Sequence, residues 1–325
     1  MSTASAPAGQ PSHRNAVLML LLANLFWGLS FPAIKALTLI HARLLPGSGN
    51  GFITAMTVAP RFLLAALILI AWQGRALLKT TASEWRQGLW LGCFAGAGMF
   101  FQNDGLQFTD ASVSAFLTQL YAILIPVWVA LRHRRCPGLQ VWVSCGLVLA
   151  GAAILGRFDW QTLSLGRGEL ETLVSSLFFM GQILTLDRPE YAGNNALRIT
   201  FVMVITEMVL FWVLAFAVAP SASDLLVFWS NIPWLGLTLL LTLFCTLGAF
   251  LIMNTWQRRI SSTEAGLIYC VEPVFGSLMA LCLPAVFSLW AGIAYANETA
   301  TWHLLLGGGL ITLANAWLQL RPQRS

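Results

Sequence analysis

The sequence predicts an all-α integral membrane protein in which ten transmembrane helices form two inverted five-helix repeats. Hydrophobic residues make up 58% of the chain, and charged residues make up only 10%. A helix needs roughly 20 apolar residues to cross the hydrocarbon core of a bilayer, and ten such stretches nearly fill the 325 residues. Because little is left for a soluble catalytic domain, we expect a function inside or across a membrane.

The predicted spans are apolar stretches separated by short polar loops. In the first half they cover residues 15–37, 53–73, 86–105, 111–131 and 138–156. In the second half they cover residues 167–186, 197–218, 233–255, 264–287 and 300–320. These ranges predict tails at 1–14 and 322–325, one five-helix repeat over 15–157 and a second over 158–321.

The basic residues predict the orientation, since Lys and Arg are retained on the cytoplasmic side. With the N-terminus inside, the inner segments hold thirteen of these residues, and the outer loops hold three, Arg43, Arg157 and Arg167. An even number of spans then places both termini in the cytoplasm, and we expect the cell (inner) membrane. This topology also accounts for the net charge of +5, so no nucleic-acid partner is expected.

A weak internal repeat relates the two halves. Gly146–Gly151 in the fifth span resembles Gly309–Ala314 in the tenth. Thr109–Ala111 leads into a span with Pro126, as Ser262–Ala265 leads into one with Pro273. Because five spans are an odd number, equivalent helices cross the membrane in opposite directions, which is an arrangement that places a transporter's substrate site near the midplane.

Five short motifs along the chain carry a family resemblance. They are Trp27–Lys35, Arg61–Ala65, Gly105–Ser112, Gln257–Arg259 and Val271–Phe275. In this order and spacing they resemble the EamA family of the drug/metabolite transporter (DMT) superfamily. The resemblance covers nearly the whole chain and implies two inverted EamA-like five-helix repeats. It also implies transport, often export, of small metabolites such as amino acids or drug-like amphipathic compounds.

Two features depart from the family pattern. Family members have a short hairpin with Gly-Glu before the last span, whereas here a longer apolar stretch, Ser288–Tyr295, precedes Asn297 and Glu298. Pro126 and Pro273 also lie at different distances from the starts of their spans. We therefore expect helix breaks that are not symmetric between the halves.

Ionisable residues within the spans carry most of the functional information, because each costs about 2.5–3.5 kcal/mol at the bilayer centre on insertion scales. They are Lys35, Arg61, Asp104, Glu207 and Glu272. Lys35 and Asp104 lie at similar depth near the outer interface. They are predicted either to pair as a gate or to extend separately to the headgroups.

The three deeper charges are candidates for the transport site. Arg61 is predicted to meet an anionic substrate or a carboxylate such as Glu207 or Glu272, with a fixed structural ion pair as the alternative. Glu272 precedes Pro273, whose missing amide breaks the helix, so it is a candidate cation or proton site or a helix-bending element. Glu207 is a candidate for proton coupling or for a packing hydrogen bond.

Uncharged polar and aromatic residues are predicted to complete the site. Those near the midplane or the inner half are Trp27, Ser30, Gln119, Tyr121, Gln182, Asn254 and Tyr269. Aromatic rings suit planar or cationic organic substrates, although Trp27 is also compatible with interhelical packing. Glycine and alanine runs such as Gly307–Gly309 are predicted to allow close helix packing.

Three classes of function remain compatible with the chain. The favoured one is a secondary transporter of small molecules, either powered by a gradient or only facilitating flux, with a proton as the candidate coupling ion and membrane lipids as its surroundings. An ATP-driven pump is disfavoured because there is no Walker sequence. An intramembrane enzyme would need a clustered His, Asp and Glu constellation, and none is evident, so no enzymatic activity and no metal or other cofactor are expected. A non-transporting scaffold is the third class, and the oligomeric state is left open.

Overall fold

The computed structural model describes residues 13–105, 108, 114, 117–134, 136–155 and 166–320, and each secondary-structure element in these ranges is helical. The first half contains α1 (His13–Leu44), α2 (Asn50–Leu77), α3 (Ala82–Gly105), α5 (Tyr121–His133) and α6 (Leu139–Leu155). The second half contains α7 (Arg167–Leu186), α8 (Ala196–Val218), α10 (Ile232–Leu240), α11 (Ala249–Trp256), α12 (Ser262–Tyr269), α13 (Glu272–Ala280), α14 (Leu283–Ala291) and α15 (Trp302–Leu320). Short turns complete it: η1 (Pro189–Tyr191), α9 (Asp224–Val227), η2 (Phe228–Ser230), the π-helix η3 (Leu241–Gly248) and η4 (Gln257–Arg259). The all-α class is therefore confirmed.

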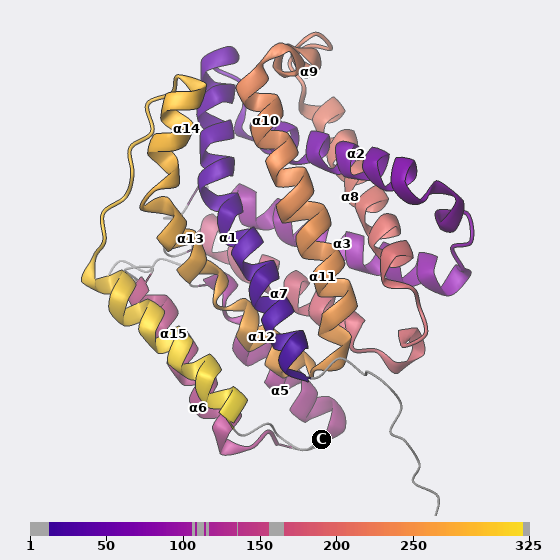
Figure 1. Ribbon diagram of the computed structural model, residues 1–325, viewed down its shortest axis with the longest axis vertical. Helices are drawn as coiled ribbons and strands as arrows, with labels where there is room; N and C mark the ends of the chain where they lie inside the picture. Colours follow the sequence, from indigo (N-terminus) through magenta and orange to yellow (C-terminus); the bar gives the residue numbers. More distant parts are fainter. Residues whose placement is uncertain are drawn as a thin grey trace, which may run out of the picture.

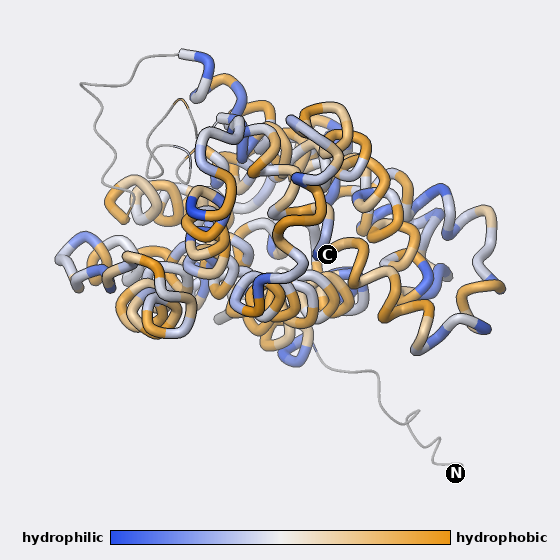
Figure 2. Tube along the Cα trace, turned by 90° about the horizontal axis from the view of Figure 1, so that it is seen from above, coloured by the Kyte–Doolittle hydropathy of each residue, from blue (hydrophilic) through white to orange (hydrophobic). Residues whose placement is uncertain are grey.

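Several of these helices are apolar enough for a membrane. By length and composition, four stretches of the described chain can cross it: α1, α2, α8 and Ile232–Arg259. A fifth forms if Ser262–Ala280 and Leu283–Ala291, which are bent by 57° at a break, count as one span. Hydrophobic residues dominate the helical turns when the molecule is viewed from above (Figure 2). The count of ten spans and the inverted relation of the halves stay predictions.

The helices of the two halves pack against one another. From the first half, α2 packs on α8, and α3 packs on α7 and α8. Through the middle, α1 runs beside α10 and α11 and contacts α13 (Figure 1). The pair formed by α6 and α15 lies along the lower left edge in that view. Side chains at the centre of the bundle therefore come from both halves.

Small residues allow the closest of these approaches. A Cβ added at Gly307 would lie 2.6 Å from the carbonyl oxygen of Gly151, and one added at Gly151 would lie 2.7 Å from that of Gly307. The backbones of α6 and α15 thus touch directly. The prediction of close packing holds for Gly307, whereas an added Cβ at Gly309 meets nothing within 4 Å.

Local sequence signals explain where several helices begin. Thr81 and Glu84 form a reciprocal capping box at the start of α3, in which each backbone N–H donates to the other side chain. The side chains of Asn195, Asn231 and Ser261 accept the first N–H groups of α8, α10 and α12. Such caps satisfy donors that the first helical turn leaves unpaired.

Both halves contain an interrupted helix near the centre. The α-helical hydrogen bonding is interrupted by a turn at Cys270 and Val271, just before Glu272 and Pro273, where a break is predicted. In the first half a turn at Gln119 and Leu120 precedes α5, while Pro126 lies inside that helix. The break therefore does not occur at Pro126. Gly266 of α12 packs against Ile125 of α5, so the two interrupted helices meet.

The apolar stretch at residues 288–295 contributes to α14 and to an extended return segment. After α14 the chain descends along α14 and α13 to α15 (Figure 1). The Asn297 side chain accepts from the backbone N–H of Ala285, at 2.7 Å, and the backbone N–H of Glu298 donates to the carbonyl of Ala280, at 2.9 Å. This segment thus satisfies backbone groups on both sides of the α13–α14 break.

Candidate functional site

Four aromatic rings from four helices form a continuous chain through the centre of the bundle. Trp27 of α1 makes edge contacts with Phe250 of α11 and Tyr269 of α12, with ring centroids 5.8 and 5.5 Å apart. Phe250 in turn stacks on Phe62 of α2 at 6.4 Å. The structure thus brings the predicted residues Trp27 and Tyr269 together. Phe62 and Phe250 were missed, because a Phe within an apolar helix gives no distinguishing sequence signal.

Arg61 lies at the α2 end of this aromatic chain. Its side chain is only 6% exposed, and its guanidinium lies 5.1 Å from the centroid of the Phe62 ring. One Nη donates weakly to the sulfur of Met99 at 3.7 Å, and Nε has no partner. A buried cation is therefore left largely without hydrogen-bond acceptors.

Glu207 of α8 is the acidic residue that interacts electrostatically with Arg61. It is fully buried, and neither carboxylate oxygen has a hydrogen-bond partner. Arg61 is close enough to interact with it electrostatically. Among the described residues, however, no ion pair within 4.0 Å joins the two. The structure supports the predicted association of these charges at longer range and does not show a direct contact.

Leaving these atoms unpaired is energetically costly. Burying a polar group without a partner costs about 1–3 kcal/mol, and a charged one costs more. A structural ion pair would offset this cost through close geometry and additional hydrogen bonds, and both are missing between Arg61 and Glu207. A fixed structural pair therefore accounts poorly for the arrangement.

The π-helix η3 passes beside Arg61. The hydroxyl of Thr242 donates to the backbone carbonyl of Arg61 at 3.3 Å. Cys245, one turn further along, is within electrostatic reach of both Arg61 and Glu272. π-helical turns are rare and occur frequently at functional sites. No sequence signal predicts this one, because residues 241–248 have an ordinary apolar composition.

Glu272 occupies the first turn of α13, at the helix break. Its side chain is half-buried and forms no hydrogen bond or ion pair with any described residue. It interacts electrostatically with Tyr121, the first residue of α5. The positive end of the α13 dipole favours a negative charge at this position. The structure thus places Glu272 where both interrupted helices meet.

The uncharged candidates divide by whether they already have partners. The Asn254 amide donates to Thr200 at 2.8 Å, the Tyr269 hydroxyl donates to Gln257 at 2.9 Å, and Gln182 donates weakly to Met253 at 3.9 Å. These contacts link helices, whereas the side-chain oxygen of Asn254 is buried without a partner.

Two further candidates retain free polar atoms. The side-chain oxygen of Gln119 is buried without a partner in the turn before α5. Half-buried Ser30 of α1 makes no side-chain hydrogen bond with the described residues. Among the uncharged candidates and Glu272, the groups left free to contact a ligand are therefore Gln119, Ser30, Glu272 and the side-chain oxygen of Asn254.

The proposed outer pair of Lys35 and Asp104 is not formed. Asp104 at the end of α3 pairs with Arg167 at 2.6 Å, and Arg167 also binds Glu171 at 2.7 Å. Lys35 is exposed and has no ion-pair partner among the described residues. Equal depth in the membrane did not imply contact, because the helix faces point to different neighbours.

A second polar cluster, also missed, joins α3 to the α7–α8 connection. Glu84 accepts from the backbone N–H of Asn195 at 2.9 Å and pairs with Arg198 at 3.4 Å. Burial by itself raises the pKa of Glu84, but hydrogen bonds from Thr81 and Asn195 and the charge of Arg198 outweigh it, so the pKa lies below its ordinary value. In the sequence, the capping signal that contains Glu84 indicates the start of a helix. It does not indicate that Glu84 also binds Asn195 and Arg198.

Gln87 extends this cluster to the second half. Its side-chain oxygen accepts from Asn194 at 2.9 Å and from Arg258 at 3.3 Å. Arg258 also donates to the carbonyl of Asn194 at 2.6 Å.

No group of three or more His, Cys, Asp or Glu side chains suited to a metal ion occurs in the described part of the chain.

Comparisons with known proteins agree with this arrangement. The sequence profile of the EamA-like transporter family matches residues 14–157. An uncharacterized transporter from Archaeoglobus fulgidus is 25% identical over 273 residues, which cover 82% of this chain and 78% of the relative. A solved crystal structure superposes with a TM-score of 0.67 at 18% identity, covering 95% of this chain and 98% of the other. The last likeness concerns the fold alone.

The sequence motifs and the profile match lead to the same assignment. Trp27–Lys35 and Arg61–Ala65, which carried the resemblance, lie within the matched residues and contribute Trp27 and Arg61 to the central site. The apolar helices that can cross a membrane agree with an integral membrane protein. Over residues 14–157 the chain is thus similar to the EamA-like transporter family, the same family that the sequence motifs resemble.

Proposed function

We propose that the protein is a secondary transporter that exports small organic metabolites, such as amino acids or drug-like amphipathic compounds. The observation that carries this proposal is the buried pair of Arg61 and Glu207, whose polar atoms lack partners beside a chain of aromatic rings. Charged groups inside a membrane bundle are costly and mark substrate or ion pathways. An amphipathic solute would supply both the missing polar contacts and the apolar surface that the rings match.

The proposed mechanism is alternating access between two inverted five-helix repeats, over residues 15–157 and 158–321. The interrupted helices α5 and α12–α13 would contribute the backbone of the site, since irregular backbone at membrane depth is tolerated where it is buried in protein or lines a cavity. In this mechanism Trp27 and Tyr269 hold the apolar part of the solute. Ser30, Gln119 and Glu272 bind its polar groups.

Coupling to a proton gradient is assigned to the two carboxylates. Glu207 faces a fixed cation, Arg61, and so its charge state would change the field at the site. Glu272 is half-buried at a helix break without a partner among the described residues, so it is accessible to an incoming proton. An intramembrane lipid- or metabolite-modifying enzyme is the alternative function.

Transport by purified protein in liposomes tests the proposal. A panel of amino acids, organic cations and nucleosides should reveal at least one solute that moves only when the protein is present and whose flux depends on an imposed pH gradient. Glu272→Gln keeps the shape of the side chain and removes its charge, so we expect flux to fall about tenfold or more, which corresponds to a lost interaction of about 1.4 kcal/mol. The remaining flux should lose its pH dependence.

Matched variants distinguish chemistry from folding. Glu207→Gln should also remove the pH dependence, whereas Glu190→Gln, at an exposed loop position, should leave flux and pH profile unchanged. If Glu272→Gln transports at the wild-type rate with the wild-type pH profile, Glu272 is a structural residue. If no solute in the panel moves, the transporter assignment itself loses its support.

A further inference from the structure

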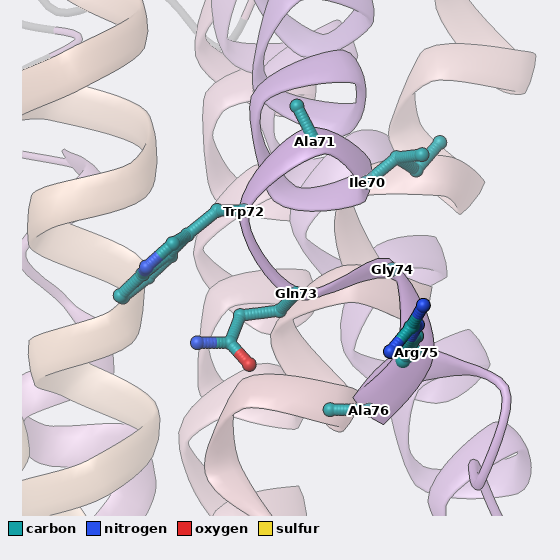
Figure 3. Close-up of a pocket in the computed structure, with 7 residues that line it drawn as sticks. All are labelled: Ile70, Ala71, Trp72, Gln73, Gly74, Arg75 and Ala76. Atoms are coloured by element: carbon teal, nitrogen blue, oxygen red, sulfur yellow. The ribbon is translucent and has the colours of Figure 1, made fainter.

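The C-terminal end of α2, which the basic residues predict to be cytoplasmic, carries a kink that no feature of the central site requires. Gln73 has φ −133° and ψ 20°, so the helical conformation is interrupted there before a last turn that ends at Leu77. Figure 3 shows the ribbon unwinding between Trp72 and Gly74, with Trp72 and Gln73 on one side and Ile70 and Arg75 on the other. There is no proline at this position, and Gly74 lowers the cost of the irregular backbone.

The kink opens a groove between α2, α3 and α8. The groove has a volume of about 410 Å³ and is lined by Ile70, Gly74, Leu77, Leu78, Thr80, Trp85 and Phe201. This size falls within the range of small-molecule clefts, roughly 300–1,000 Å³. Its lining is almost entirely apolar, so an occupant must present hydrocarbon to it. Ile70 and Gly74 also line the shallower hollow at the kink that contains Arg75.

Two basic residues next to the groove lack anionic partners in the described part of the chain: Arg75 lines the adjoining hollow, and Lys79 lies between the groove residues Leu78 and Thr80. Arg75 and Lys79 are exposed, and neither forms an ion pair with a described residue. The nearby carboxylate, Glu84, is buried and already bound to Arg198. Two unpaired cations therefore border an apolar groove, which is complementary to a molecule with one negative head and a hydrocarbon tail.

The position along α2 identifies the source of such a molecule. The apolar part of α2 ends here, where the predicted span at 53–73 leaves the hydrocarbon core. Trp72 and Trp85 are 64% and 42% exposed, and tryptophan is enriched at the headgroup level of bilayers. A bilayer lipid can therefore place its phosphate at the height of Arg75 and its chain against the groove.

We propose that this groove binds one anionic glycerophospholipid. Its phosphate group contacts Arg75 and Lys79, and an acyl chain packs between Leu77, Trp85 and Phe201. All bilayer lipids offer the same hydrocarbon, so selectivity arises from the headgroup charge. Basic side chains near an anionic membrane surface contribute roughly fivefold each to binding.

Native mass spectrometry of delipidated protein titrated with defined lipids tests this site. We expect one phosphatidylglycerol to bind more tightly than phosphatidylcholine, by roughly tenfold or more for two basic contacts. Arg75→Gln and Lys79→Gln should each lower the ratio of the two affinities roughly fivefold and leave phosphatidylcholine binding unchanged. Arg132→Gln, at an exposed residue near the end of α5, is the charge-matched control and should change neither.

The apolar part of the site has its own control. Trp85→Ala should weaken binding of both lipids, whereas Trp317→Ala, at a residue 43% exposed on α15, should weaken neither. Glycerol phosphate, which has the head without the chains, should not displace the bound lipid. Raising the salt concentration should reduce phosphatidylglycerol binding to the wild-type protein, and this test needs no variant.

Two results would overturn the proposal. Equal affinity of the wild type for the two lipids at low salt would show that Arg75 and Lys79 do not select a headgroup. A phosphatidylglycerol preference that survives Arg75→Gln with Lys79→Gln would place the anionic site elsewhere. Because this assay measures lipid binding and not flux, its outcome is independent of the transport test.

Discussion

At the residue scale, buried polar side chains separate into those with partners and those without. Tyr269 forms a hydrogen bond that links two segments of the bundle, and Asn254 forms one through its amide N–H while its side-chain oxygen has no partner. Arg61 and Glu207 retain unpartnered atoms in the same interior. Since native proteins satisfy the large majority of buried polar groups, the unpartnered pair is the more informative one.

Glu84 gives a pH-dependent prediction at this scale. Its pKa in the folded protein lies below the ordinary value, so its stabilising effect is present above the pKa of the unfolded chain, roughly 4.3. That effect is lost as the pH falls through the lower pKa of the folded state. We expect Glu84→Gln to reduce stability at pH 7 by about 1.5–3 kcal/mol, the typical contribution of hydrogen bonds to charged groups.

Thermal unfolding in detergent from roughly 0.8 units below to roughly 2.7 units above the usual Glu pKa, about pH 3.5 to 7, checks this prediction. The difference in Tm between wild type and Glu84→Gln should narrow as the pH falls. Glu190→Gln is the control, because the exposed Glu190–Arg188 pair at 3.7 Å contributes little. A pH-independent difference would mean that Glu84 acts through packing and not through its charge.

Residue-scale sequence reasoning found the buried charges but not their neighbours. The cost of burying charge in an apolar span picks out Arg61, Glu207 and Glu272 directly. Partner choice depends on helix rotation and packing, which a single sequence does not specify. Lys35 and Asp104 were predicted either to pair or to extend separately to the headgroups, and no signal in the sequence indicated that Asp104 pairs with Arg167.

At the element scale, the interrupted helix α12–α13–α14 shows how a break is tolerated. The break after α13 exposes a carbonyl at Ala280 and an N–H at Ala285. The return segment satisfies both through Glu298 and Asn297. Backbone groups in a lipid environment must be satisfied internally, so the segment functions as a cap for two helix ends.

Asn297→Ala should therefore loosen this break. Loss of a side-chain cap costs about 1 kcal/mol, with a range of roughly 0.5–2 kcal/mol. We expect a lower Tm and faster hydrogen exchange at Ala285 and its neighbours, measured by mass spectrometry. Asn50→Ala is the control, because Asn50 is exposed at the first turn of α2 and caps nothing. Unchanged exchange at α14 would show that the cap contributes nothing.

Hydropathy predicts elements well where a helix is long and apolar. The second predicted span ends at residue 73, where the kink of α2 lies, and the sixth matches α7 at both ends. The pattern could not reveal α14 as a separate helix, the capping role of Asn297 or the π-helix η3. These features depend on tertiary hydrogen bonds, and their residues are ordinary in composition. Much of the Gly105–Ser112 motif lies outside the described residues.

At the scale of the whole molecule, the central site depends on both halves. Arg61 and Trp27 come from the first half, and Glu207, Phe250 and Glu272 come from the second. The two halves are held together here because α2 and α3 of the first half pack on α8 of the second. A relative movement of the halves would therefore separate or join the charges and rings of the site, as alternating access requires.

The last prediction concerns membrane topology, which decides which face of the site opens to the cytoplasm. Thirteen basic residues in the inner segments against three in the outer loops predict that the α5–α6 loop is cytoplasmic and the α1–α2 loop is outside. The exposed thiol of Cys136 reports on the first loop. Gly49→Cys reports on the second, because an added side chain at Gly49 meets nothing within 4 Å.

A membrane-impermeant maleimide added to intact cells should label Gly49→Cys, made in a Cys136→Ser background, and should leave wild-type Cys136 unmodified until the membrane is permeabilised. A fluorescent reporter that matures only in the cytoplasm should be active after Ser325. Labelling of Cys136 in intact cells would show that the orientation is opposite to the predicted one. An inactive C-terminal reporter, with both loops on the predicted sides, would show that the number of spans is odd. An odd number would also remove the argument that two five-helix halves have opposite orientation.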